Sequence, residues 1–231
     1  MKRLLLLLLL LPLFIACPRQ KAPEPIVSPP VSVISVLITS VPENVEILFD
    51  DKIVSTPARF KVRSIDQLLT NNIKAAKNMT EAVEQRIKVY SEEEIEVILI
   101  FDSGLSKMAN TLRLAKILVF DYGDSITFDF NKYEIKPAFI PLLAKQAYML
   151  KKYFDGIDAY ICGHSDSVGR HDYNLELSLN RAKSVYDELI KLGVRGANMR
   201  VQGFGSNYPL ASNDNEAGRA QNRRIEIILG R

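Results

Sequence analysis

One stretch of the chain, residues 161–224, constrains the fold more than any other segment. An apolar strand ends in Gly163-His164-Ser165-Asp166, a polar turn follows, and the next helix carries Arg181-Ala182. The stretch closes on Gly218-Arg219 and Asn222-Arg223-Arg224. Such a series of polar motifs between apolar elements is far more specific than any single motif, because one tertiary arrangement must accommodate all of them.

Apolar periodicity predicts alternating strands and helices around these motifs. We expect one helix from about Pro137 to Tyr153, with proline at a favourable first-turn position, and another from about Tyr173 to Leu192, with Asp172 as its N-cap. Strands are expected at 117–120, 157–162, 199–204 and 224–229. Helices with one apolar face that alternate with strands predict a two-layer α/β sandwich.

The whole series is similar to the peptidoglycan-associating C-terminal domain of OmpA and Pal proteins. That family combines a strand, GH(T/S/A)D, YN..LS..RA, a late G.G...P and GR..NRR, and nearly every element occurs here at the family's spacing. The resemblance begins near Ile126 and implies the fold class α+β. It predicts an OmpA-like sandwich of order βαβαββ over residues 118–231.

The resemblance also implies a binding site for the peptide stem of peptidoglycan at Asp166 and Arg181. Asp166 would take the ammonium of diaminopimelate, and Arg181 would take its carboxylate through a planar two-point hydrogen bond. On residue chemistry alone, a structural ion pair between the two side chains explains them equally well. The other positions that match the family's site are Phe128, Asp129, Tyr133, Asn174, Leu177 and Arg224. Arg219 and Arg223 are interpreted as structural ion partners.

Other chemistry is not expected. The run from Gly163 to Ser167 nearly spells a hydrolase nucleophile elbow, but its final glycine is missing and a polar turn separates it from the next helix. His164 and His171 lack the spacing of helical metal ligands, so we expect no metal, no cofactor and no catalytic residue. The 30 basic and 27 acidic residues give a net charge of +3, which does not indicate nucleic-acid binding.

The N-terminal residues indicate export. Lys2 and Arg3 precede the apolar run Leu4 to Ile15, which is shorter than the roughly 20 residues of a membrane span and fits a signal peptide. Phe14-Ile15-Ala16-Cys17 resembles a lipobox, which implies a lipoprotein signal peptide at 1–16 and acylation, as by palmitate, at Cys17. The alternative is an ordinary signal peptide followed by a chance cysteine. The other cysteine, Cys162, is expected to be buried in a strand.

Three further segments complete the predicted organisation. Residues 17–32 are a proline-rich tether, residues 33–102 are β-rich, and residues 103–117 are a connector with a helical turn. Ser40, Pro42, Ile47 and Thr56-Pro57 make the β-rich part similar to the PEGA domain, a small sandwich. Within it, 95–101 is the expected closing strand, and the apolar spacing in 64–83 favours a short helix.

Together these features predict a lipoprotein that anchors the membrane to peptidoglycan non-covalently. The expected location is the outer membrane, with the protein held by lipid and facing the periplasm. Its expected partners are peptidoglycan and, through Cys17, the membrane. The alternative is an accessory subunit of a secretion or motility complex, in which the β-rich part docks another envelope protein.

Overall fold

The protein is described by a computed structural model of the whole chain. The described residues are 33–63, 68, 73–90, 94–102, 104, 106–122, 128 and 131–230, and all of them belong to one compact unit, Ser32–Arg231. The predicted signal peptide 1–16, the tether 17–32 and Cys17 lie outside them.

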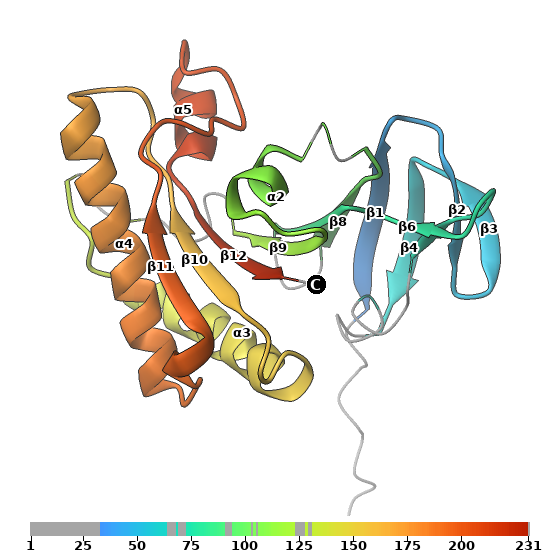
Figure 1. Cartoon of the computed structure of the whole chain (residues 1–231), viewed down its shortest axis with the longest axis horizontal. Coiled ribbons are helices and arrows are strands. Elements are labelled where there is room, and N and C mark those ends of the chain that lie inside the picture. The colour runs from blue at the N-terminus through green and yellow to red at the C-terminus, as the bar shows by residue number, and fades with distance from the viewer. Residues whose placement is uncertain are drawn as a thin grey trace, which may run out of the picture. The chain divides into compact units, whose positions relative to one another are not determined.

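A mixed eight-stranded sheet forms the framework, with the strand order β11-β10-β12-β9-β7-β8-β1-β4 (Figure 1). Its strands are β1 (Ile34–Val41), β4 (Ala58–Val62), β7 (Glu84–Val89), β8 (Glu94–Ile100), β9 (Ile117–Asp121), β10 (Ala159–Gly163), β11 (Met199–Gly203) and β12 (Ile225–Gly230). A second sheet has the order β3-β2-β5-β6 and contains β2 (Glu46–Phe49), β3 (Lys52–Ser55), β5 (Lys74–Ala75) and β6 (Thr80–Glu81).

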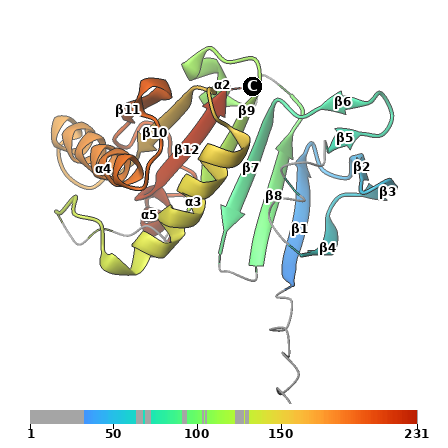
Figure 2. The ribbon, with the colours of Figure 1, turned by 90° about the horizontal axis from the view of Figure 1, so that it is seen from below.

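Helices cover both faces of the large sheet near its C-terminal strands (Figure 2). The described helices are α2 (Lys107–Leu112), α3 (Ile140–Tyr153), α4 (His171–Lys191) and α5 (Glu216–Asn222), with 3-10 turns η2 (Pro137–Phe139) and η3 (Gly196–Asn198). Alternate strand residues point to opposite faces. Leu118, Phe120 and Ile227 therefore join the core beneath α3 and α4, whereas Val119 and Ile228 join the smaller core beneath α2.

The predicted fold class is confirmed, with differences in detail. The helix expected from Pro137 consists of η2 followed by α3, and the short α5 precedes the last strand. Helix α4 begins at His171, so the prediction of Asp172 as its N-cap was wrong. Arg170 holds that position, and Asp172 lies in the first turn, where its negative charge is favourable.

The sheet runs through the expected boundary between the two halves of the chain. Strand β7 pairs in parallel with β9 and antiparallel with β8, which in turn pairs with β1. Strands from 33–102 and from 118–231 therefore share one sheet, and their division into two domains stays a prediction. The connector contains the expected helical turn as α2, which Ser106 caps by accepting a hydrogen bond from the Ala109 backbone.

Two elements of the β-rich part differ from the prediction. Strand β7 was not predicted, because Glu84, Gln85 and Arg86 make its sequence polar, although all three side chains are buried. The short helix expected within 64–83 is wrong for 74–81, where β5 and β6 form a hairpin. The expected closing strand is present as β8.

Among the helices in the described part of the chain, none is long and apolar enough to cross a bilayer.

Candidate functional site

The candidate site lies where β10 ends and the loop to α4 begins. Gly163 ends the strand directly against α4, and a Cβ added there would lie 2.0 Å from the Ser178 carbonyl oxygen. Only glycine lets the helix approach this closely. The backbone of the loop is fixed on its other side, because His164 N donates to Arg224 O at 3.0 Å and Ser165 N donates to Gly205 O at 2.8 Å.

Asp166 is held in this loop by two hydrogen bonds. Its Oδ1 accepts from the Val168 backbone N–H at 3.0 Å, and its Oδ2 accepts from Arg223 Nη1 at 2.7 Å. Arg223 also donates through Nη2 to Glu216 at 2.6 Å. An ionised carboxylate has about four acceptor positions, so two bonds leave Asp166 capacity for a cationic ligand.

Arg181 reaches the same region from α4 and is 5% exposed. Its Nε donates to Lys132 O at 3.1 Å, and its guanidinium lies 5.0 Å from the centre of the Phe128 ring. Burial lowers the pKa of Arg181, and the positive charge of Arg223 lowers it further, whereas Asp166 raises it. Among the described residues, no carboxylate forms an ion pair with Arg181, because Asp166 pairs with Arg223 instead.

Asn174 gives the loop its shape rather than facing solvent. It is buried, and its Nδ2 donates to Val168 O at 2.9 Å and to Asp166 O at 3.3 Å. Tyr133 is exposed near Lys132, and Leu177 is half-buried on α4. Asp129 lies outside the described residues.

Arg224 is not brought to this cluster. It is 2% exposed, its Nε donates to Glu226 at 2.8 Å, and its Nη1 donates to Tyr208 O at 3.2 Å. A direct ligand contact by this side chain is therefore not supported. The neighbouring Arg223, interpreted from the sequence as an ion partner only, is the residue that contacts Asp166, and Arg219 pairs with Glu216.

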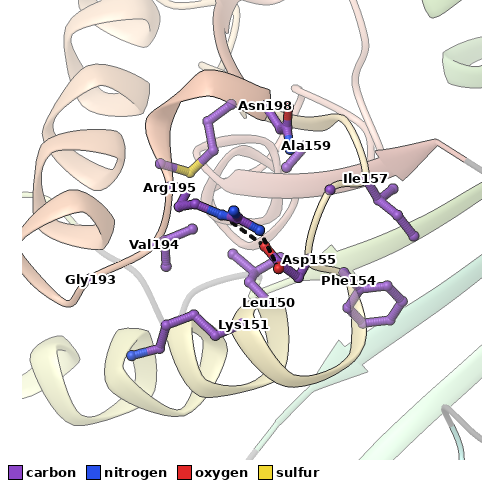
Figure 3. A pocket seen from close by; sticks show the side chains of 12 residues that line it. Leu150, Lys151, Phe154, Asp155, Ile157, Ala159, Gly193, Val194, Arg195 and Asn198 are labelled. Atoms are coloured by element: carbon purple, nitrogen blue, oxygen red, sulfur yellow. Dashed lines mark hydrogen bonds and ion pairs between the residues drawn. The ribbon is translucent and has the colours of Figure 1, made fainter.

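One cavity is separate from this loop. It has a volume of about 200 Å³ and lies at the start of β10 (Figure 3). Asp166 follows the other end of that strand. Leu150, Phe154 and Val194 contribute apolar lining, and Arg195 Nε donates to Asp155 at 3.0 Å beside them. No group of three or more potential metal ligands occurs among the residues that the structure describes.

Comparisons with known proteins agree on the C-terminal part. Residues 127–223 match the sequence model of the OmpA family. The chain is 40% identical over 112 residues to the probable lipoprotein YiaD of Escherichia coli (strain K12), which covers 48% of this chain and 51% of that protein. It is 38% identical over 107 residues to the peptidoglycan-binding protein ArfA of Mycobacterium tuberculosis (strain ATCC 25618 / H37Rv), which covers 46% and 32%.

A solved structure is also similar in sequence. The crystal structure of the peptidoglycan-associated lipoprotein from Burkholderia pseudomallei is 35% identical and matches 45% of this chain and 87% of that chain, with a TM-score of 0.42. The chain spans about half or less of the two curated relatives' lengths. The family match does not extend into residues 33–102, where the PEGA resemblance stays a prediction.

Proposed function

Because residues 127–223 form an OmpA-family domain, we propose that this protein binds the diaminopimelate-containing stem of peptidoglycan without covalent chemistry. The relatives named as peptidoglycan-binding or peptidoglycan-associated support this ligand. The observation that carries the proposal is the state of Arg181. Its guanidinium is buried, oriented by Lys132 O and Phe128, and without a carboxylate partner among the described residues.

The geometry suits a ligand that carries both charges. Arg181 would donate two parallel hydrogen bonds to the stem carboxylate, and a desolvated guanidinium makes such charge-assisted bonds strong. Asp166 lies close enough to influence the pKa of Arg181 and retains acceptor capacity for the ammonium. Binding of this kind needs no nucleophile and no general base, so we propose a binding protein and not an enzyme.

Titration calorimetry with a diaminopimelate-containing tripeptide tests the site. A charge-assisted hydrogen bond contributes about 1.5–3 kcal/mol, so Arg181→Ala and Asp166→Ala should each weaken binding by roughly one to two orders of magnitude. Arg181→Lys should fail nearly as badly, because one ammonium cannot make the planar contact. The control is Lys183→Ala, an exposed position on the same helix. Wild-type affinity in a folded double variant, Asp166→Ala with Arg181→Ala, would refute the proposed site.

We further propose that acylated Cys17 holds the protein in the outer membrane, facing the wall across the tether 17–32. The relatives named as lipoproteins support this arrangement. The alternative, docking of another envelope protein through residues 33–102, has one favourable feature. Strand β4 is an edge of the large sheet, and a partner strand can add to such an edge.

A further inference from the structure

A buried ion cluster joins the two halves of the chain on the sheet face beneath α2. Arg86 of β7 donates through Nη1 to Glu226 of β12 at 2.5 Å and to Asp121 of β9 at 3.1 Å, and through Nε to Glu84 at 3.0 Å. Glu84 in turn accepts from Ser106, the N-cap of α2, at 2.7 Å. The side chains of Arg86, Glu226 and Asp121 are 9%, 0% and 2% exposed.

The strand register explains why these charges meet. Glu226 lies directly opposite Asp121, and Arg86 lies opposite Val119, one same-face position along β9. Side chains at such direct and diagonal positions are within reach of one another. The long Arg86 side chain also extends across β9 and reaches Glu226 on the strand beyond it. Removing one partner of a buried ion cluster leaves an uncompensated charge, so Arg86 is required where Glu226 and Asp121 are both ionised.

Glu226 connects this cluster to the loop of the candidate site. Its Oε1, which accepts from Arg86, also accepts from Arg224 Nε at 2.8 Å. Its Oε2 lies 3.4 Å from Nε2 of His164, whose ring stacks on Phe204 with centroids 5.5 Å apart. One carboxylate therefore contacts a side chain of the N-terminal half and two residues that border the site.

His164 and Arg224 both lie within two residues of the site in the sequence. His164 stands two positions before Asp166, and Arg224 follows Arg223, whose guanidinium holds Asp166. The backbone of His164 also donates to Arg224 O. A shift of the Glu226 carboxylate would consequently displace Asp166 in two ways, through His164 and through Arg224 with Arg223.

We propose that Arg86 is a positioning residue for peptidoglycan binding: by holding Glu226, it fixes His164 and Arg224, and through them Asp166 and Arg223. This inference rests on the proposed function of the Asp166–Arg181 site. Arg86, which belongs to the N-terminal half, would then support peptidoglycan binding without touching the ligand.

The pKa of His164 can be used to detect the loss of the contact between Arg86 and Glu226. The charged groups that act on its ring are Glu226 from β12, Arg224 before β12 and Arg86 from β7. Burial lowers the pKa of His164, Arg224 and Arg86 lower it further, and Glu226 raises it. Replacing Arg86 with methionine removes a positive charge, so the pKa of His164 should rise.

The experiment measures tripeptide affinity by calorimetry and His164 titration by NMR on the full-length protein at pH 5.5, 6.5 and 7.5. The chain has only two histidines, and the exposed His171 serves as an internal reference. Arg86→Met should weaken binding by about 2- to 30-fold, and the size of the loss should change with pH as His164 titrates. Arg86→Lys keeps the charge and should fall between wild type and Arg86→Met. Arg59→Met, an exposed arginine on β4, is the matched control and should bind like wild type.

The outcomes separate this inference from the proposed function. Absence of binding by the wild type would refute the proposed function itself. Wild-type affinity in folded Arg86→Met, or weaker binding with an unmoved His164 titration and an unchanged pH profile, would overturn the positioning role alone. Should circular dichroism find Arg86→Met unfolded, Arg86→Lys decides: binding measurably weaker than wild type supports the role, and equal binding refutes it.

Discussion

Replacing Gly163 with alanine should displace α4 from the sheet and damage the site with it. The added Cβ would lie 2.0 Å from Ser178 O and 2.8 Å from its carbonyl carbon. Both are backbone atoms inside a helix, so no side-chain rotation relieves the overlap. Since real Cβ contacts are not shorter than 3.0 Å, helix and strand must separate by roughly 1 Å at this point.

The expected loss of stability follows from the cost of overpacking a core. Forcing extra volume into a packed core costs about 1–3 kcal/mol. In a folded unit of this size, 1 kcal/mol lowers Tm by about 2–4 °C, so we expect a loss of about 2–12 °C. Arg181 lies three residues beyond Ser178 on α4, and its displacement from Asp166 should weaken tripeptide binding as well.

Calorimetry and thermal unfolding measured side by side test this reasoning. The control is Gly230→Ala, whose Cβ would first meet a Leu114 methyl group at 3.2 Å, the flexible end of a side chain. A Gly163→Ala variant that keeps both the Tm and the affinity of the wild type would show that α4 does not depend on this close approach.

Three further outcomes are expected. Cys17→Ala should move the protein from the membrane to the soluble envelope fraction, and a wild type without fatty acid would contradict the anchor. The fragment 118–231 should be less stable to urea than the full chain, because β9 loses its β7 neighbour and Glu226 loses Arg86; equal stability would support two separate domains. Stability should fall on acidification. The lowered pKa of His164 makes the unfolded chain bind a proton first below about 6.5, and the lowered pKa of Glu226, where Arg86 and Arg224 outweigh burial, adds a further loss below about 4.5. Urea unfolding of wild type and His164→Gln at pH 7 and 5 measures the histidine part, up to about 1.4 kcal/mol per pH unit, and equal pH dependence would refute it.

Residue patterns were enough to predict the architecture of the C-terminal part. Its two long helices and its strands follow from apolar periodicity, because α3 and α4 each bury one face against the sheet, whereas the short α5 was not predicted. The motifs from Gly163 to Arg224 indicated an OmpA-like domain, and the family match confirmed it. Asp166 and Arg181 could be chosen as a pair because they match the positions of the family's binding site, although their role as ligand contacts stays a prediction.

Which charged side chains are buried could be known only from the folded sheet. Strand β7 reads as polar, yet Arg86 is buried because its partners Asp121 and Glu226 come from strands 35 and 140 residues away in the chain. Glu84 is buried because it pairs with Arg86 and accepts from Ser106. Arg223 and Arg224 are equivalent in the sequence, but one contacts Asp166 and the other enters the buried cluster. Apolar periodicity predicts the burial of apolar side chains, which has no electrostatic cost. It cannot record burial that is offset by a partner elsewhere in the chain, since only the folded sheet brings the opposite charges within hydrogen-bonding distance.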